Sequence, residues 1–446
     1  GRLYGEGRVE HRDGTTYAGE FVDGMPEGFG RFSWPDGTYY EGPFKKNCAE
    51  GHGRKLFADG SWFEGNFVSG NFEGHGVFHM TDGTEFEGLW HQNRIKGPGC
   101  ARLSDGTTLS GLFEEGGACG EGKKMWANGC VFTGVLSRNC IGQQGTLQWP
   151  DGRCYIGAFQ DNQLHGEGTL VWSDRGGVCT YRGQFEKNVF EGVGKLMWSS
   201  GARYEGMFKN GLYHGEGMFK WPNSSGTYRG SWVCGEMSGK GTLKSTPGEG
   251  ERDAYIYVGT FKRGQMEGSG NITFYRAGDS GMDSYQGEFK ASRFSGSGTY
   301  TWFAGAQLEG LFEDGYCNRV GRKVYSDGTM YTGELRFDLE HGKGVMSEPG
   351  GRSYVAIWAD GKTVKELLGS CVPEFDLVDM PDTNVPPRVP QNAPMKPLKS
   401  ISMPFSPKGG GAGMTPNHTF EALNTPVHNT TLLEDPAEEE NENSDD

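Results

Sequence analysis

The amino-acid sequence predicts an all-β fold, an elongated and twisted solenoid-like sheet of about 15 tandem β-hairpins. A 23-residue phrase that runs from Tyr17 to Tyr39 recurs without a gap from Tyr40 and again from Phe63. Within the phrase, large apolar side chains alternate with small or polar ones at a period of two, the pattern of a β-strand. Self-similarity at a fixed period indicates that each phrase is one structural unit that stacks on its neighbours.

The first residue of each copy of the phrase, called its opening residue, is aromatic or leucine, and counting these residues gives the number of units. The interval between openings is 23 residues up to Tyr155 and then becomes 26, 23, 24, 29, 28, 23, 23 and 23 residues. The extra residues near 175–179, 247–253 and 277–283 are rich in Gly, Asp or Pro and predict enlarged turns, which are candidate adaptor sites. The fifteen openings are Tyr17, Tyr40, Phe63, Phe86, Leu109, Phe132, Tyr155, Tyr181, Tyr204, Tyr228, Tyr257, Tyr285, Leu308, Tyr331 and Tyr354.

Each phrase is expected to form one hairpin. In the first complete copy, Tyr17, Gly19 and Phe21 share one face of a strand, and a second alternating run follows at 28–34. Between and after these runs stand the Gly, Pro and Asp residues that tight turns require. Because the glycines share a face with the aromatic residues, we expect them to leave room for rings from an adjacent hairpin.

The end of the chain departs from the repeat. The hairpin array is predicted to cover residues 1–361, followed by a short capping helix at 362–370, where TVKELL carries a helical pattern. Such a helix would cover the open edge of the sheet. Residues 371–446 lose the period and hold twelve of the twenty prolines, so we expect a Pro-rich, acidic, disordered tail. The candidate phosphorylation sites in this tail, each followed by proline, are Ser406, Thr415 and Thr425.

Composition and charge exclude several classes of protein. The chain has 446 residues and 77 glycines but no Gly-X-Y triplet period, so it is not a collagen. The formal net charge is −15, and residues 434–446 contribute eight acids and no base, so no nucleic-acid partner is expected. No run of about 18 apolar residues could span a bilayer, and the first residues lack the apolar stretch of a signal peptide. A soluble cytoplasmic protein is therefore expected.

The cysteines and histidines show no pattern that predicts a metal site. The ten cysteines fall at varied repeat positions without a Cys-x-x-Cys pair, so reduced thiols are expected rather than disulfides or metal ligands. Five histidines lie beside the repeat glycines, one per unit and in one repeat position. Successive hairpins are about 10 Å apart in a stack, which is too far for shared zinc ligation. We expect no metal and no cofactor. The histidines are His52, His75, His165, His214 and His341.

Catalytic motifs are not visible either. Pairs such as Gly28 and Gly30 resemble the start of a phosphate-binding loop, but no third glycine opens a helix and no Gly-Lys-Ser/Thr follows. Their repetition at hairpin positions favours a structural role. The sequence contains no H-E-x-x-H, no G-x-S-x-G and no Cys/His nucleophile arrangement. It therefore predicts a protein that is not an enzyme.

Two kinds of binding surface stay open. Tryptophans recur just before the second turn of many units, and they fit either an inter-repeat core, which we favour, or an exposed aromatic groove for a partner peptide. Basic pairs such as Lys45 with Lys46 and Lys123 with Lys124 would bind anionic lipid if the twist of the sheet brought them together. The candidate partner-binding tryptophans are Trp34, Trp126, Trp149, Trp172, Trp198, Trp221 and Trp302.

The phrase resembles the MORN repeat (membrane occupation and recognition nexus) over about residues 4–361. The order Y-x-G-x-F, then G-x-G and D-G within 23 residues, carries the resemblance, with YEGPF from Tyr40 and LHGEGTLVWSD from Leu164 among the close copies. Departures from the pattern predict distorted or capped repeats. They are Gln143 and Arg319, where the first glycine of G-x-G is expected, and Ala356 in the last unit.

The resemblance implies an extended single-layer sheet of hairpins that acts as a scaffold. Neither the catalytic domain of the lipid-kinase and histone-methyltransferase relatives nor the transmembrane helix of junctophilin-like relatives is visible in this sequence. Repeats followed by an acidic tail look most like the radial-spoke-head proteins of the cilium. We therefore expect a non-catalytic scaffold that binds other scaffold or axonemal proteins along its sheet, in the cytoplasm, the cytoskeleton or the axoneme of a cilium or flagellum.

Three points stay open beside this interpretation. One alternative function is a membrane-tethering module that binds phospholipid, and another is a targeting subunit for an enzyme. Self-association into a homo-oligomer is also compatible with the sequence.

Overall fold

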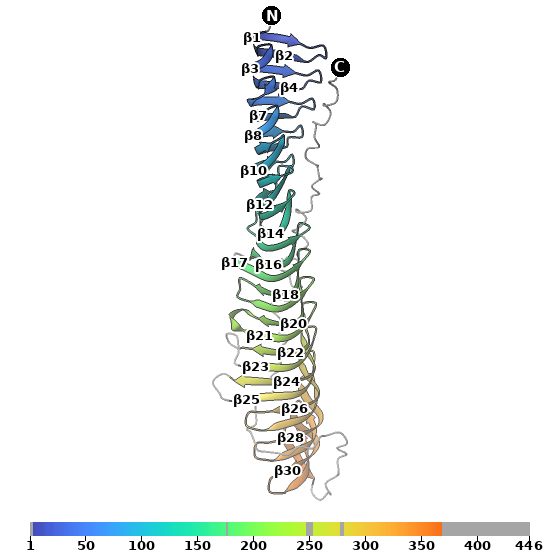
Figure 1. Cartoon of the computed structure of the whole chain (residues 1–446). Coiled ribbons are helices and arrows are strands. Elements are labelled where there is room, and N and C mark those ends of the chain that lie inside the picture. The colour runs from blue at the N-terminus through green and yellow to red at the C-terminus, as the bar shows by residue number, and fades with distance from the viewer. Residues whose placement is uncertain (1–2, 175–176, 247–252, 277–280, 368–446) are drawn as a thin grey trace. The chain divides into compact units, whose positions relative to one another are not determined.

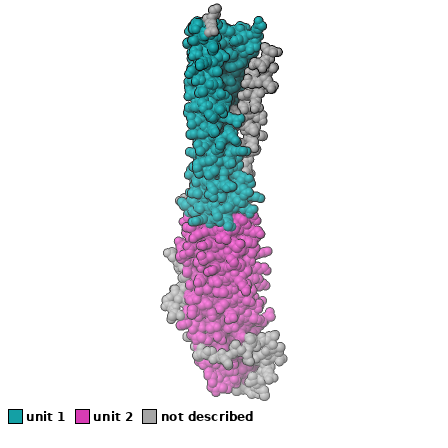
Figure 2. Space-filling model, viewed as in Figure 1, with its two compact units in different colours: residues 1–189, 416–446 teal, residues 190–415 magenta. Residues whose placement is uncertain are grey.

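The computed structural model describes residues 3–174, 177–246, 253–276 and 281–367. These residues form 32 β-strands and one short 3₁₀ turn, η1 (Pro222–Ser224). The described part of the chain divides into two compact units, unit 1 up to residue 189 and unit 2 from residue 190 onward (Figure 2). In the part of the chain that is described, no helix is long and apolar enough to cross a bilayer. The predicted all-β array of tandem hairpins is confirmed.

The strands of unit 1 follow one another in chain order, each antiparallel to the next, and β4 pairs with both β5 and β6 (Figure 1). Their bounds are β1 (Gly5–Glu10), β2 (Thr16–Val22), β3 (Met25–Ser33), β4 (Tyr39–Lys45), β5 (Cys48–Ala49), β6 (Gly51–Leu56), β7 (Trp62–Val68), β8 (Asn71–His79), β9 (Glu85–His91), β10 (Arg94–Arg102), β11 (Thr108–Glu114), β12 (Gly117–Met125), β13 (Val131–Ser137), β14 (Cys140–Gln148), β15 (Cys154–Gln160), β16 (Gln163–Asp174) and β17 (Gly177–Glu186).

Unit 2 repeats the same antiparallel order (Figure 1). Its strands are β18 (Val189–Met197), β19 (Arg203–Lys209), β20 (Leu212–Lys220), β21 (Gly226–Val233), β22 (Glu236–Ser245), β23 (Asp253–Lys262), β24 (Gln265–Arg276), β25 (Met282–Lys290), β26 (Arg293–Thr301), β27 (Gln307–Glu313), β28 (Tyr316–Val324), β29 (Met330–Arg336), β30 (Leu339–Ser347), β31 (Ser353–Ala359) and β32 (Lys362–Leu367).

A two-residue turn closes each hairpin, and both of its residues have positive φ. In the hairpin of β2 and β3 these residues are Asp23 (φ 56°) and Gly24 (φ 84°), and in β9 and β10 they are Gln92 (φ 48°) and Asn93 (φ 63°). Two positive φ values define the type I′ turn, whose twist matches that of the flanking strands and which favours Gly or Asn. The opposite edge of the sheet carries the turns between hairpins, where the Asp36 carboxylate accepts a hydrogen bond from the Thr38 backbone N–H at 2.8 Å.

A β-bulge in the second strand of the hairpin gives the repeated glycines two different roles. Gly19 faces Gly30 across β2 and β3, but Phe21 faces Pro26, so three residues of β3 lie opposite Glu20 alone. Gly28 stands in this bulge with φ 71°, a conformation that L side chains rarely adopt. The paired Gly19 and Gly30 instead make room, because a Cβ atom on Gly19 would lie 2.7 Å from the Tyr17 hydroxyl oxygen.

The ring that fills this space belongs to the opening residue of the same hairpin, not to an adjacent hairpin as the sequence suggested. Tyr17 is 1% exposed, and its hydroxyl donates a hydrogen bond to the backbone oxygen of Glu20, opposite the bulge, at 3.0 Å. This bond explains why tyrosine is the commonest opening residue. The tyrosines that bond the carbonyl three residues further on are Tyr17, Tyr40, Tyr155, Tyr181, Tyr204, Tyr228, Tyr257, Tyr285 and Tyr331.

Rings of consecutive hairpins pack edge to face and form the core of each unit. Tyr40 meets Phe44 of its own hairpin at 5.1 Å between ring centroids and Phe67 of the next hairpin at 4.7 Å. In unit 2, Tyr257 contacts Phe261 and Phe289 in the same way, at 5.1 and 4.9 Å. Edge-to-face pairs of this kind stabilise a structure by about 0.5–1.5 kcal/mol beyond the area that they bury. The core is therefore a ladder that ties each hairpin to the next.

The predicted capping helix at 362–370 is wrong for the residues that are described. Residues 362–367 form β32, antiparallel to β31, after a turn at Asp360 (φ 47°) and Gly361 (φ 81°) of the same kind as in the other hairpins. Six residues are too few to stabilise a helix alone, whereas a strand gains ladder hydrogen bonds from β31 at once. The array thus extends to residue 367, and residues 368–370 and the predicted tail at 371–446 lie outside the described residues.

The three departures from the repeat pattern have different structural outcomes. Arg319 keeps the bulge conformation with φ 69°, as a glycine would. Gln143 does not have positive φ, so the bulge in β14 is distorted as predicted. Ala356 faces Gly344 and is fully buried, and the neighbouring Tyr354 ring lies nearly parallel to Trp358 at 25° instead of edge-on. A methyl group at position 356 occupies the space that the opening ring fills elsewhere.

The insertions predicted as enlarged turns lengthen the strands as well. β16 has 12 residues, and its ladder with β17 continues to the pair Asp174 and Gly177. β24 also has 12 residues and pairs with β25 as far as Tyr275 and Met282. The remaining inserted residues, 175–176, 247–252 and 277–280, lie outside the described residues.

Candidate functional site

The candidate tryptophans stand at the edge of the sheet that carries the turns between hairpins. Trp34 opens such a turn, because its N–H donates to the Thr38 carbonyl at 2.8 Å and its carbonyl accepts from the Gly37 N–H at 3.2 Å. Trp149 and Trp221 are buried, at 6% and 8% exposure, and Trp34, Trp126, Trp172, Trp198 and Trp302 are half-buried. The ring contacts of Trp198 and of Trp221 with Phe219 agree with a role in the core. Partner binding by these residues stays a prediction.

Cations lie over several of these rings on the core-facing side of the sheet. Lys55 Nζ is 5.6 Å from the ring centroid of Trp34, Lys124 Nζ is 5.3 Å from that of Trp126, and Lys323 Nζ is 5.2 Å from that of Tyr325. Burial lowers the pKa of Lys55 and of Lys124. These three lysines occupy a repeat position that holds Phe32, Leu147 or Leu170 elsewhere. Sequence analysis missed them, although a lysine in an otherwise apolar column was the available signal.

A buried cluster of ionisable groups surrounds the third lysine. Lys323 Nζ lies 2.9 Å from Glu340 Oε1, and the side chains are 16% and 5% exposed. The Tyr325 hydroxyl donates to the same carboxylate. Asp338 Oδ1 accepts the Cys317 backbone N–H at 2.7 Å, and burial raises the pKa of Asp338 to about 6. Burial also raises the pKa of the Cys317 thiol to about 12, so this thiol is no nucleophile at neutral pH.

Hydrogen bonds join the hairpin turns of consecutive repeats, and this set of bonds between neighbouring turns is called the clasp. The N–H of the second turn residue donates to a carbonyl of the preceding repeat, as from Asn93 to Phe72 at 3.3 Å and from Asn139 to Ala118 at 3.0 Å. In Asn93, Asn139 and Asn188 the side-chain oxygen also accepts the backbone N–H of the same partner residue, at 2.8, 2.7 and 2.7 Å. The same geometry at Asp338 explains its buried carboxylate.

Glutamates of the bulge complete this clasp. Lys46 is the first turn residue of the next hairpin, and its backbone N–H donates a hydrogen bond to the Glu27 carboxylate at 2.9 Å. These bonds lie in exposed turns, and the carboxylate gives the turn N–H a charged acceptor. The glutamate before the bulge glycine is therefore an inter-repeat acceptor, not a free surface acid. The glutamates in this role are Glu27, Glu50, Glu73, Glu191 and Glu267.

The outer face, opposite the rings, carries an aromatic stack in unit 1 that sequence analysis also missed. Trp62 lies between the guanidinium of Arg54, 4.1 Å from the ring centroid, and the imidazole of His79, at 3.7 Å and 19°. One hairpin earlier, Arg31 covers Tyr39 at 3.8 Å. Both aromatic residues precede the opening residue of a repeat, and their recurrence at that position was the signal in the sequence.

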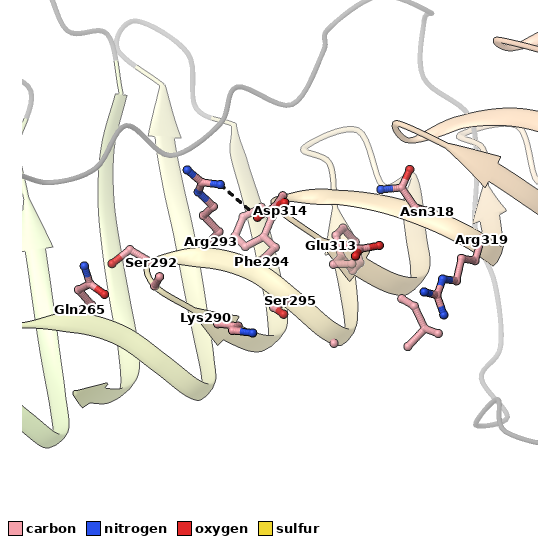
Figure 3. A pocket seen from close by; sticks show the side chains of 14 residues that line it. Gln265, Lys290, Ser292, Arg293, Phe294, Ser295, Glu313, Asp314, Asn318 and Arg319 are labelled. Carbon is pink, nitrogen blue, oxygen red and sulfur yellow. Dashed lines mark hydrogen bonds and ion pairs between the residues drawn. The ribbon is translucent and has the colours of Figure 1, made fainter. Parts of the chain in front are cut away.

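A shallow hollow of about 880 Å³ opens on unit 2 beside the turns at 291–292 and 314–315 (Figure 3). Arg293 Nη1 and Asp314 Oδ1 are 3.1 Å apart in it, and both side chains are mostly exposed. Lys290, Glu313 and Arg319 add charges of both signs around the rim. Mixed, solvated charges give this hollow no single ligand chemistry.

The histidines and cysteines form no metal site among the residues that the structure describes. His52 and His75 lie on the outer face inside the G-x-G pair, whereas His165, His214 and His341 precede the bulge glycine, so the histidines occupy two repeat positions and not one. No group of three His, Cys, Asp or Glu side chains in the described ranges could hold a metal ion. The nine cysteines described are free thiols. Ser406, Thr415, Thr425 and Cys371 lie outside the described residues.

Comparison with known proteins identifies the repeat. A profile of the MORN repeat matches thirteen segments, which together cover more than half of the chain. The units that open at Phe132 and Tyr354 lie outside the matches, and these are the units that contain Gln143 and Ala356. The matched segments are 17–39, 40–62, 63–85, 86–108, 110–131, 155–176, 181–203, 204–226, 228–249, 257–275, 285–307, 309–330 and 331–352.

Individual relatives are more distant. The chain is 28% identical to rat (Rattus norvegicus) Alsin over 140 residues and to human Alsin over 157 residues, or 30% and 34% of this chain. It spans less than a tenth of the length of these relatives, 8% and 9%. A catalytically inactive virginiamycin B lyase from Staphylococcus aureus aligns with 61% of this chain and 88% of its own, at 10% identity and a TM-score of 0.12, and that likeness carries no argument.

Proposed function

Because the chain belongs to the MORN repeat family, we propose that it is a non-catalytic scaffold that binds partner proteins along the outer face of its sheet. The proposal rests on the observation that the contacts that hold the array together lie on one face of the sheet and at the hairpin turns. Rings and paired glycines occupy the core-facing side, and the clasps at the turns hold each hairpin to the next. Neither arrangement uses the outer-face side chains, which are therefore available for binding.

Apolar side chains on this outer face support a protein partner. Ile156 is 58% exposed, Val193 61%, Val258 54% and Leu311 46%, each on a strand whose inward-facing neighbours are buried. Recurring exposed apolar residues on one face of a sheet suit a partner that buries them, since such patches mark interaction surfaces.

The experiment uses single lysine substitutions on this face and a control in a hairpin turn. Ile156→Lys or Val258→Lys should lower the yield of co-purified partners at least about fivefold without changing the melting temperature. Phe337→Lys, at an equally exposed position in a hairpin turn that holds lysine in other repeats, should leave the yield unchanged. If the outer-face variants retain every partner of the native chain, the proposal fails.

The finer setting of this scaffold is an axoneme or another cytoskeletal assembly, with other scaffold proteins as partners. This step rests on the order of repeats and acidic tail, which resembles that of radial-spoke-head proteins. Detergent extraction of ciliated cells tests it, because the scaffold should remain with salt-washed axonemes. Release with membranes would favour the phospholipid-tethering alternative, and recovery with a stoichiometric catalytic partner would favour the targeting-subunit alternative.

A further inference from the structure

The outer face of β18 to β22 in unit 2 carries a cationic strip within an acidic chain. Its six members alternate with the buried residues Leu196, Tyr204, Phe219, Tyr228 and Leu243, which places them on the outer face. The cationic strip consists of Lys195, Arg203, Lys220, Arg229, Lys240 and Lys244.

The strand register places like charges side by side. Arg203 faces Lys220 directly across β19 and β20, and Thr227 of β21 lies between Lys220 and Lys244. Directly opposed like charges destabilise a sheet. Within the described residues, Arg203, Lys220 and Lys244 make no ion pair that would offset this cost. The arrangement is therefore suited to an anionic ligand.

Carboxylates on the same face neutralise only part of the strip. Glu205 lies 3.7 Å from Lys195 Nζ, and Glu216 accepts a hydrogen bond from Ser231 Oγ at 2.5 Å. Lys209 adds one positive charge beside the hairpin turns, and Glu191 and Glu236 add two negative charges there. The outer face of β18 to β22 keeps an excess of three positive charges.

We propose that the acidic segment 434–446 of the same chain docks on the cationic strip and covers this part of the outer face. The segment carries eight carboxylates and no basic residue, which complements the strip in sign. The two carboxylates inside the strip favour a peptide, which can pass between them, over a flat anionic membrane. The proposal goes beyond the scaffold function, because it makes access to one section of the face depend on the chain's own end.

The length of the chain permits this contact. Residues 368–433 join β32 to the acidic segment, and a chain of this length can span at most roughly 220 Å. β20 and β32 are twelve strands apart in unit 2, or about 58 Å at the usual strand spacing. Tethering at such distances gives an effective concentration on the order of millimolar, which allows even weak charge pairing to be occupied.

The test is zero-length carbodiimide cross-linking of the full chain, with peptide mapping by mass spectrometry. We expect cross-links from Lys195, Lys240 and Lys244 to carboxylates of 434–446, and about a tenfold lower yield in 0.5 M NaCl than in 0.05 M NaCl. The double variant Arg203→Gln, Lys220→Gln should lower the yield from the three remaining lysines at least about fivefold. The control Arg336→Gln, Lys343→Gln removes two exposed cations of β29 and β30 and should leave the yield unchanged.

Three results would overturn the proposal. The first is the absence of these cross-links, or an equal yield in the strip and control variants. The second is that cross-links join isotope-labelled to unlabelled chains in a mixture, which would place the segment on a second copy. The third is that the full chain binds phosphatidylserine vesicles through the strip as tightly as a chain without residues 434–446, which would make lipid the occupant.

Discussion

The buried pair of Lys323 and Glu340 offers a sharp test of how charge is tolerated inside the array. The change is Lys323→Met, which removes the ammonium group 2.9 Å from a carboxylate that is 5% exposed. The Tyr325 hydroxyl would remain as a partner but carries no positive charge. Leaving one member of a buried ion pair without its counter-ion costs about 3–5 kcal/mol. We expect a loss of that size in the free energy of opening β28 to β30.

A second variant separates the net contribution of the ion pair to stability from the cost of leaving one buried charge unpaired. In the hairpins of unit 1, Leu147 and Leu164 occupy the repeat positions that correspond to Lys323 and Glu340, and both are 0% exposed. The double variant Lys323→Leu, Glu340→Leu copies this apolar solution. Replacing a buried ion pair by packed apolar side chains is often neutral or stabilises by about 1–4 kcal/mol. We therefore expect it to restore at least native stability.

The measurement is hydrogen exchange of β28 to β30 in the native state, because a repeat array opens locally and a single global transition is not assured. Arg293→Met is the matched control, since the Arg293–Asp314 pair has a similar distance of 3.1 Å but side chains that are 59% and 80% exposed. Its loss should stay below about 1 kcal/mol. If Lys323→Met costs no more than this control, or if the double variant is as unstable as the single one, the reasoning is refuted.

Three further predictions concern single repeat positions. Tyr331→Phe removes the hydrogen bond to the Glu334 carbonyl at 2.6 Å and should lower the free energy of local opening by about 1–2 kcal/mol. Hydrogen exchange measures this, and an unchanged exchange rate would contradict the role given to the hydroxyl. Arg319→Gly should stabilise by about 1 kcal/mol in urea, because φ is 69° there; a loss of stability would show that the side chain matters more than the backbone. Burial raises the pKa of Asp338 in the folded state to about 6, above its usual 3.8. The folded state therefore holds this proton more tightly than the unfolded state, and stability should fall as pH rises from about 4 to about 6. Asp338→Asn should remove this dependence and be more stable than the native protein at pH 7 by up to about 3 kcal/mol. A melting curve series that shows the same pH slope in both proteins would exclude this assignment.

Much of the fold could be predicted because each repeat shows the same alternation of apolar and polar residues and the same turn residues. Alternation at Tyr17, Gly19 and Phe21 predicted a strand and its inner face, and the structure bears out both. The bulge could not be predicted, because Gly28 and Gly30 look alike in the sequence while one bends the backbone and the other receives a ring. Period-two reasoning assumes a regular ladder, and a bulge breaks that assumption.

The errors at the end of the array and inside the core share one physical cause. TVKELL has a helical pattern, but an available ladder from β31 decides its conformation. Lys323 and Glu340 stand at repeat positions that hold apolar residues elsewhere, but only their register across two hairpins shows that they are buried together. In both cases a partner from a neighbouring hairpin outweighs the local preference of the residues.

The same dependence on neighbours explains how this array can carry binding function on its outer face. Tyr17 packs against Phe44 of the next hairpin, and Glu27 accepts the Lys46 N–H of that same hairpin. These contacts use the inner face and the turns, so substitutions at outer positions such as Ile156 or Arg203 change the binding surface and leave the stacking intact. An array built in this way can vary its outer charge from one hairpin to the next without changing its inner face, as Arg203 and Lys220 of the cationic strip illustrate.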